Sequence, residues 1–452
     1  MTTPLDNKDF LQGNAMKSPA SVFLLLFLLV AALPASAQGQ TQSYDLKKAV
    51  EYALKANPTI ESKLLAIEKA EMDFNTSLTA FMPKASLVWN WNKMENSGGV
   101  GTSEDYTNKT LNRGLRTQLS LFAGFMHLNS AGKALLTVDM EEANHRQARL
   151  ELIGNVQLHF FNLFKAREDM KTVQESKNRI ATQLKAAKAF VEVGMAPYLN
   201  VLQNEVEMSK VNQQEIRMAN TIRNTEVALN RFLGYGPGDV IAYTGSLEDF
   251  VGSIPYGEEE ALEISMVKRP NLIIAQKSVA IALKQSHITA GRYLPNVNAT
   301  YDNMRMNKAY EDRAGDYTRR YWSIGMNVTW DFFEGGQTTF TYIADRKAAA
   351  SLRKDYEDAM AEARASVIKS LLDAQSAKEL IAVSSKGVDA AKESYAMANR
   401  RYQTNTGTIT DLLDAQLNLT KAEEDHSAAL AEYNSARSRF FYNIGIENIG
   451  LE

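Results

Sequence analysis

The sequence predicts a mainly α-helical fold with a small β part, in which one unit of helix, strand, strand, long helix and helix occurs twice. Three observations predict this fold class. Two stretches, 127–193 and 338–404, keep helical apolar periodicity for about 67 residues without a proline. Prolines and glycines recur along the chain at an offset of 211 or 212 residues. Segments between the helices alternate apolar and polar residues with period two, which is typical of strands.

The two long helices set the scale of the molecule. At ~1.5 Å per residue, a helix of ~67 residues is ~100 Å long, whereas helices of globular domains average about 11–12 residues. In the first copy, two shorter helices, 53–82 and 198–233, together match the length of the long helix. Stacked end to end, they would run beside it along its whole length. This arrangement indicates a tube wall rather than a globule.

Proline positions support the helix boundaries. Pro83 and Pro295 stop the first helix of each copy, because proline does not continue a helix. Pro58 and Pro270, each 25 residues earlier, mark a bend or a start. The helices are rich in alanine, either because alanine permits close helix approach or because of its high helix propensity. The expected helices of copy one are 45–82, 127–193 and 198–233, and those of copy two are 258–292, 338–404 and 409–443.

Each copy also contains two candidate strands. The clearest is 321–331, where every second residue from Trp322 to Trp330 is apolar and the residues between are small or polar. Similar alternation marks 86–92, 115–121 and 296–302, and polar loops are expected at 95–110 and 308–319.

Two structures fit such strands. One is a small half-buried sheet, and the other is a membrane barrel with about 9–11 residues per strand, apolar outside and polar inside. Four strands from one chain do not close a barrel, and open edges are not stable in lipid. A barrel would therefore need several chains, and three chains would supply twelve strands.

Residues 1–37 are expected to be a cleaved signal peptide. The positive charge of Lys17 precedes an apolar run at 21–33, and Ala-Ser-Ala at 35–37 supplies a small-residue cleavage site. The alternative, a transmembrane anchor, needs about 20 apolar residues, which is more than this run provides. The polar stretch 1–15 precedes Met16-Lys17, the more natural start, and is either an extra leader or an artefact of the assigned start.

The repeat sets the other expected boundaries. Leu121–Gly124 and Phe332–Gly335 match at an offset of 211, as do Gly194 and Asn405, two residue types that adopt the left-handed conformation of a helix end. A register that holds over about 180 residues indicates an internal duplication. The expected parts are a first structural repeat at 38–234, a linker segment at 235–257, a second structural repeat at 258–446 and a C-terminal tail at 447–452.

Composition excludes several classes of function. The chain has no cysteine, which removes thiolate metal sites, disulfides and cysteine nucleophiles. Its 5 histidines fit no metal-binding spacing, and a formal net charge of −3 shows no nucleic-acid footprint. Since the sequence contains no nucleophile elbow or phosphate-binding loop, we expect neither an enzyme nor a cofactor.

A motif near the C-terminus carries the most specific family resemblance. Residues 402–416 read YQTNTGTITDLLDAQ and join two helices through a turn. With the duplicated Asn57-Pro58 and Arg269-Pro270 pairs and the strand-entry prolines, this motif resembles the TolC-type outer-membrane efflux protein family. The resemblance covers essentially the whole mature chain.

The resemblance implies a homotrimer in the outer membrane of a Gram-negative bacterium, extending into the periplasm. Three copies would form an α-helical periplasmic barrel joined to a shared twelve-stranded β-barrel, with four strands per chain. The segment 235–257 and the C-terminal tail would form an equatorial collar. The implied partners are a periplasmic adaptor (membrane fusion) protein, an inner-membrane pump of the resistance-nodulation-division or ABC type, and outer-membrane lipid, with no nucleic acid.

Two carboxylates of the motif are implied to line the pore at its narrowest point. Asp411 and Asp414 match the pore-facing residues of the family, and their spacing puts them on one helix face. Threefold symmetry would form a ring of six carboxylates, which repels anions and binds cations. Alternatively, Asp411 caps the helix that begins nearby. Tyr402 matches a tyrosine of the same region, where it acts as a gate or simply packs between helices.

The tips of the two copies differ. Copy one has Asn200 and Gln203 where copy two has Asp411 and Asp414, so any carboxylate ring comes from copy two alone. The resemblance implies that Gly407 stands where members of the family can carry a basic residue that ties the closed tip, so the sequence does not assign the closing contact.

We expect the adaptor protein to contact the tips at Gly194 and Asn200 in copy one and at Asn405 and Gly407 in copy two. The tip would be closed at rest, and this contact would untwist the last two helices. The expected function is a passive gated conduit, the exit duct of a tripartite efflux or type I secretion system. The alternative is an exported coiled-coil scaffold without a channel, which explains the helices and the repeat but not the alternating strands.

Overall fold

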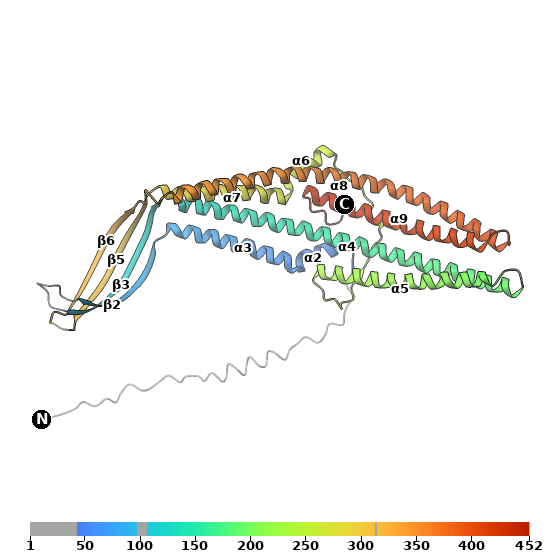
Figure 1. Ribbon diagram of the computed structural model, residues 1–452, viewed down its shortest axis with the longest axis horizontal. Coiled ribbons are helices and arrows are strands. Elements are labelled where there is room, and N and C mark those ends of the chain that lie inside the picture. The colour runs from blue at the N-terminus through green and yellow to red at the C-terminus, as the bar shows by residue number, and fades with distance from the viewer. Residues whose placement is uncertain (1–42, 97–105, 312–313, 452) are drawn as a thin grey trace, which may run out of the picture. The chain divides into compact units, whose positions relative to one another are not determined.

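The computed structural model describes residues 43–96, 106–311 and 314–451. Tyr44–Asp239 and Tyr243–Glu452 form one compact unit, which holds all the long elements of the described chain (Figure 1). The expected signal peptide, 1–37, lies outside the described residues. Among the helices that are described, none is both long enough and apolar enough to cross a bilayer.

The helices follow the expected duplication. Copy one contains α2 (Leu46–Ala56), α3 (Pro58–Leu78), α4 (Met126–Glu192) and α5 (Leu199–Leu233). Copy two contains α6 (Glu258–Lys268), α7 (Pro270–Ala290), α8 (Gln337–Gln403) and α9 (Ile409–Ile444). Short 3-10 turns are η1 (Thr79–Phe81), η2 (Glu248–Phe250) and η3 (Gly291–Tyr293).

The first helix that the sequence predicts in each copy is two helices. Asn57 and Arg269 leave the helical conformation, with ψ of 122° and 117°, because a residue before proline is pushed out of the α region. Pro58 and Pro270 then start α3 and α7. Proline suits this position because the N–H that it lacks would have no partner within the helix. The Asn57 side chain caps α3 by accepting from the backbone N–H of Thr59 at 2.9 Å.

Equivalent glycines confirm that the duplication is structural. Gly234 ends α5 with φ of 80°, and a Cβ there would lie 3.0 Å from the carbonyl oxygen of Ala56. Gly445 ends α9 with φ of 75°, and a Cβ there would lie 2.7 Å from the carbonyl oxygen of Lys268. In both copies a left-handed glycine therefore lets the end of the last helix approach the end of the first.

Helix α4 is the centre of the bundle. It packs against α2, α3, α5, α7 and α9, whereas α8 packs against α6, α7 and α9 (Figure 1). The side chains of Phe160 and Phe161, near the middle of α4, are fully buried. On α8 the close contacts are made by alanines, since Ala374 and Ala377 pack against Tyr433 of α9. The alanines of this seam thus permit close helix approach.

Four antiparallel strands form one sheet in the order β2-β3-β5-β6. The strands exceed the lengths that the alternation indicates, because β2 and β3 extend into the expected loop 95–110 and β5 and β6 into 308–319. The bounds are β2 (Lys84–Asn96), β3 (Tyr106–Ala123), β5 (Asn296–Tyr310) and β6 (Tyr317–Thr329), with the two-residue strands β1 (Ser43–Tyr44) and β4 (Ala242–Tyr243) elsewhere.

The register gives the sheet an apolar face and a polar face. Leu87, Leu115 and Trp322 lie in one row and define the apolar face, where Leu87 is 87% and Trp322 is 68% exposed. The opposite, polar face carries Arg116 and Ser323. The largest apolar side chains of the sheet are therefore uncovered in a single chain, which does not fit the half-buried sheet of a soluble protein.

Arg437 of α9 holds the linker segment and the C-terminal tail. Its buried guanidinium donates to the carbonyl oxygens of Phe250 at 2.6 Å and Leu451 at 2.7 Å. Burial lowers the pKa of Arg437, since its charged form loses water. Arg149 of α4 adds a two-pronged ion pair with Glu447, with nitrogen–oxygen distances of 2.8 and 2.7 Å. The linker segment is thereby fastened to α9, and the tail to both α9 and α4.

Candidate functional site

The two turns that follow the long helices form the candidate functional site. One joins α4 to α5 and the other joins α8 to α9 (Figure 1). The strands lead into the first residues of α4 and α8, and the turns follow their last residues. Each turn is therefore separated from the sheet by a helix of 67 residues, about 100 Å long.

The α8–α9 turn is a tight helix end. Asn405 adopts the left-handed conformation with φ of 60°, which asparagine tolerates better than most residues that carry a Cβ. The backbone N–H groups of Thr406 and Gly407 donate to the carbonyl oxygen of Arg401 at 2.8 and 3.1 Å. A Cβ on Gly407 would lie 3.0 Å from the Cβ of Arg401. The close packing of the turn therefore favours glycine at this position.

Helix α9 begins with a reciprocal cap. The Thr408 hydroxyl accepts from the backbone N–H of Asp411 at 3.1 Å, and the backbone N–H of Thr408 donates to the Asp411 carboxylate at 3.2 Å. Such a capping box satisfies N–H groups that have no partner within the helix. These bonds from Thr408 lower the pKa of Asp411, because they favour its charged form. Asp411 therefore caps α9, which was the alternative to its role in a carboxylate ring.

Asp411 and Asp414 lie on the uncovered face of α9. Both are exposed, whereas Leu412 and Ala415 beside them are buried. The face that carries the two carboxylates therefore points away from the core of its own chain. The six-carboxylate ring needs further copies of the chain and stays a prediction.

Tyr402 lies inside the tip. It is 5% exposed and packs with Ile409 and Leu412, and its ring centroid lies 5.9 Å from that of Phe190 on α4. Its buried hydroxyl makes no hydrogen bond of good geometry within the described residues. Burial raises the pKa of Tyr402, and the nearby Asn200 side chain opposes that rise. Tyr402 thus joins the two helix pairs just above the turns, as ordinary packing would, and a gating role stays a prediction.

The α4–α5 turn has a similar backbone and different chemistry. Gly194 is left-handed with φ of 74°, in the place of Asn405, and the N–H of Met195 donates to the carbonyl oxygen of Phe190 at 2.8 Å. Helix α5 begins without a side-chain cap, and Asn200 is half-buried. The two turns are therefore alike in shape, and the helices that follow them differ, since α9 carries two carboxylates among its first six residues and α5 carries none there.

Above the tips, α4 and α9 meet along a polar seam that the sequence analysis missed. The Gln183 amide donates to Gln416 Oε1 at 2.6 Å, and the Ser427 hydroxyl donates to Asp169 at 2.5 Å. The signal was the spacing of 4, 3 and 4 residues between polar positions on the buried face of α9. We define the polar seam as Asp169, Ser176, Arg179 and Gln183 of α4 with Gln416, Thr420, Glu423 and Ser427 of α9.

An acidic pair lies at one end of the seam. Asp169 is 4% exposed and forms an ion pair with Lys165 at 2.6 Å. Burial raises the pKa of the neighbouring Glu424, and the charge of Asp169 raises it further. Gln214 of α5 donates to Glu424 at 2.8 Å. The seam is thus a chain of hydrogen-bonded polar side chains between the first and the second helix pair, although Nε of Arg179 and Oε1 of Gln183 are buried without a partner among the described residues.

Comparison with known proteins places the chain in a family. The family model described as "Outer membrane efflux protein" matches residues 49–235 and 262–442. The chain is 23% identical to outer membrane protein TolC of Vibrio cholerae serotype O1 over 423 residues, which cover 90% of this chain and 92% of that protein. The Campylobacter jejuni CmeC outer membrane channel superposes with a TM-score of 0.78 at 15% identity, over 97% of this chain and 94% of that one. CusC superposes with a TM-score of 0.80 at 15% identity, over 92% and 96%.

The chain therefore belongs to the outer membrane efflux protein family. It is an outer-membrane protein, and its mainly helical fold with a small sheet part is that of the solved outer-membrane channels. The family consists of channels rather than enzymes, as the sequence analysis expected.

Proposed function

We propose that three copies of this chain form a passive gated conduit, the outer-membrane exit duct of a tripartite efflux or type I secretion system. The sheet is the observation that carries the proposal. Its edge strands, β2 and β6, have 13 residues each and run in opposite directions. The β6 edge of one copy would pair antiparallel with the β2 edge of the next. Three copies would close a twelve-stranded barrel and leave no unpaired edge in lipid.

Closure would give the sheet its two environments. The apolar face, with Leu87 and Trp322, would contact lipid, and the polar face would line the lumen. The helices would continue the lumen as a tunnel of about 100 Å through the periplasm. Between the repeats 38–234 and 258–446, the linker segment 235–257 would join the tail 447–452 in a collar around this tunnel.

At the tip, the exposed carboxylates of Asp411 and Asp414 would form the selective constriction. Their threefold repetition would attract cations and repel anions. Tyr402, packed on Phe190, would hold the closed tip together from within each chain. A periplasmic adaptor would contact the turns at 194–200 and 405–407, and the inner-membrane pump, of either class, would supply the substrate.

The polar seam supports this gating. Hydrogen bonds between side chains contribute little net free energy, because water replaces them when they separate. Helices α8 and α9 would therefore shift against α4 with less loss of free energy than if the seam were an apolar core. The adaptor would drive this shift by binding the open arrangement of the helices more tightly than the closed one, because only a difference in affinity moves the equilibrium.

The test combines mass and conductance. Light scattering with the detergent subtracted should give three copies per particle, and the same preparation should form single channels in a planar bilayer. A monomer or dimer that does not conduct would contradict the proposal and restore the scaffold without a channel.

A further inference from the structure

Three arginines lie in one row on the apolar face of the sheet. The register pairs Arg113 of β3 with Arg305 of β5, and Arg305 with Arg320 of β6. Directly paired residues share a face, with Cβ atoms about 4.5–5.5 Å apart, and like charges at this spacing repel each other. Trp89 of β2 completes the row, and the Arg113 guanidinium lies 5.6 Å from the centroid of its ring. We call these four residues the arginine row.

The arginine row has no acidic partner in the described part of the chain. Arg116, on the polar face, pairs with Asp302 at 2.7 Å. In contrast, none of the arginines at 113, 305 and 320 is within ion-pair distance of a described carboxylate, and Nε of Arg305 is buried without a hydrogen-bond partner. The sheet therefore neutralises an arginine of its polar face and leaves a concentrated positive charge on its apolar face.

The arginine row lies at the level of an outer membrane interface. Trp330, Phe332 and Phe333 are exposed where the strands meet the helices, and in the closed barrel they would form one aromatic girdle. Arg320 is 10 residues from Trp330, about 33 Å along a strand. At a tilt of ~40° this is ~25 Å along the membrane normal, which is the height of the apolar band of such barrels. The arginines thus stand at the far headgroup level rather than within the hydrocarbon.

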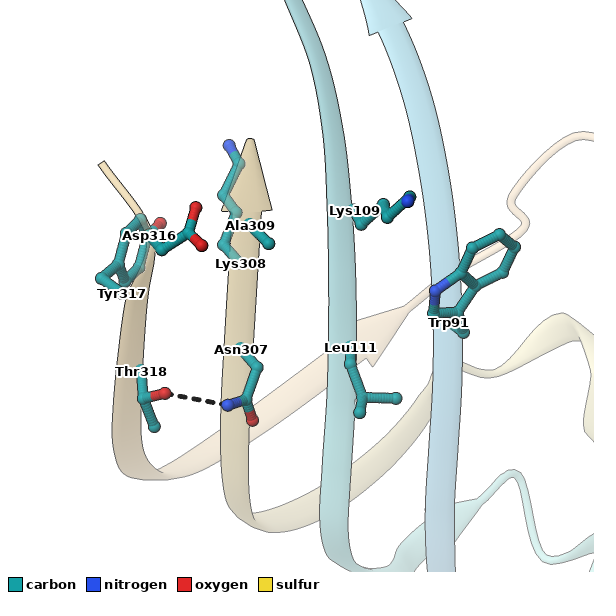
Figure 2. A pocket seen from close by; sticks show the side chains of 9 residues that line it. All are labelled: Trp91, Lys109, Leu111, Asn307, Lys308, Ala309, Asp316, Tyr317 and Thr318. Atoms are coloured by element: carbon teal, nitrogen blue, oxygen red, sulfur yellow. Dashed lines mark hydrogen bonds between the residues drawn. The ribbon is translucent and has the colours of Figure 1, made fainter. Parts of the chain in front are cut away.

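A hollow of about 420 Å³ lies beside the row, and Figure 2 shows the side chains that line it. Lys109 stands at its rim and forms an ion pair with Glu311. The carboxylate that lines the hollow, Asp316, accepts from the backbone N–H of Tyr310 at 2.9 Å. The floor is the next row of paired residues, Trp91, Leu111, Asn307 and Thr318.

We propose that the arginine row and this hollow bind the phosphate groups of a phosphorylated glycolipid of the lipid A type in the outer leaflet. The arginine fork forms paired hydrogen bonds with phosphate oxygens, and a phosphate between neighbouring arginines removes the repulsion within the row. Indole rings such as those of Trp89 and Trp91 are preferred at the boundary of headgroup and hydrocarbon. The inference rests on the proposed channel, because closure of the barrel turns this face outward.

The test counts the glycolipid that the purified full-length protein retains. Wild type and the triple variant Arg113→Gln, Arg305→Gln and Arg320→Gln are titrated in detergent with diphosphorylated lipid A, and bound lipid is counted by native mass spectrometry. Each basic residue near an anionic surface strengthens binding roughly fivefold, so the variant should bind about 100-fold more weakly. Dephosphorylated lipid A with the same acyl chains should bind to the wild type as weakly as diphosphorylated lipid A binds to the variant.

Two variants control for damage to the sheet. Arg319→Gln changes the residue beside Arg320 on the opposite face and should bind as the wild type does. The triple lysine variant at 113, 305 and 320 keeps the charge and should retain part of the binding. Two outcomes would overturn this site and leave the channel intact. In the first, a wild type that conducts retains both lipids equally. In the second, the wild type and the glutamine variant retain diphosphorylated lipid A equally. A wild type that does not insert into bilayers would overturn the channel together with this site.

Discussion

Helices α4 and α8 have the same length of 67 residues and the same place in the repeat, and their surroundings are opposite. At matched positions, Phe161 of α4 is fully buried, whereas Leu372 of α8, 211 residues later, is 55% exposed. Helix α4 is enclosed by helices of its own chain, and α8 keeps large apolar side chains uncovered. The duplication has therefore supplied one helix that stabilises the chain and one that is free to contact neighbouring copies.

The same asymmetry extends to the tips. Both turns use a left-handed residue to end the long helix, but only α9 begins with a capping box and exposes two carboxylates. The first copy provides the scaffold, and the second provides the groups that a pore would use. This difference teaches that duplicated backbones diverge in function through the side chains on their free faces.

The largest expected effect separates the two helices at one matched position. Phe161→Ala removes a fully buried aromatic ring and should lower the free energy of unfolding by about 3–5 kcal/mol. Leu372→Ala should change the free energy of unfolding of the single chain by less than about 0.5 kcal/mol, because the Leu372 side chain is exposed in the single chain. Urea unfolding of the separated chains in detergent measures both. Similar losses from the two variants would contradict the comparison.

The polar seam should show the next effect. Gln416→Leu removes the nearer acceptor of the Gln183 amide and leaves it only the Tyr395 hydroxyl at 3.3 Å, which should cost about 1–3 kcal/mol of unfolding free energy. The double variant Gln183→Leu with Gln416→Leu should recover most of this loss, because the buried amide that lost its acceptor is then absent as well. If the seam yields during gating, the double variant should also open less often in single-channel recordings. If the double variant loses as much unfolding free energy as the two single variants lose together, the assigned contact between Gln183 and Gln416 is wrong.

The carboxylates of the second tip can be compared with their counterparts in the first. Asp411→Ala with Asp414→Ala should raise the concentration of divalent or trivalent cation that blocks single-channel current by about tenfold or more, because the charges that hold the cation are gone. Asn200→Ala with Gln203→Ala is the matched control and should leave the block unchanged. Unchanged block in the aspartate variant would exclude the ring.

The smallest expected effect concerns the cap of α9. Thr408→Ala should destabilise the first turn of α9 by about 1 kcal/mol, detected as faster amide hydrogen exchange in that turn. Tyr198→Ala at the start of α5 is the control, since α5 has no side-chain cap to lose.

The same cap should depend on pH in a defined direction. The bonds from Thr408 lower the folded-state pKa of Asp411. The contribution of the carboxylate is therefore complete above the ordinary aspartate pKa and is lost as the pH falls through the lowered value. Exchange in the first turn of α9 should accelerate over this acidic range in the wild type and not in Asp411→Asn. Equal pH profiles would show that the carboxylate does not act as the cap.

By itself, the sequence determined the features that depend on neighbouring residues. The long helices and the strand alternation follow from local periodicity and from prolines such as Pro58 and Pro270, whose backbone restrictions act wherever they occur. The duplication follows from the recurrence of such residues at an offset of 211 or 212. The motif at 402–416 was specific enough to indicate the family that the comparison confirms. Strand ends were harder to predict, because pairing with the next strand continues the ladder into polar stretches.

Only the tertiary structure decided which of these local features meet. The burial of Tyr402, the enclosure of α4 and the contact of Gln183 with Gln416 depend on which helices are neighbours, across 233 residues of sequence in the last case. The arginine row likewise depends on the register of three strands, since each strand alone shows only one arginine at the positions of its apolar face. Periodicity tells which face of an element is apolar, and packing alone decides what that face touches.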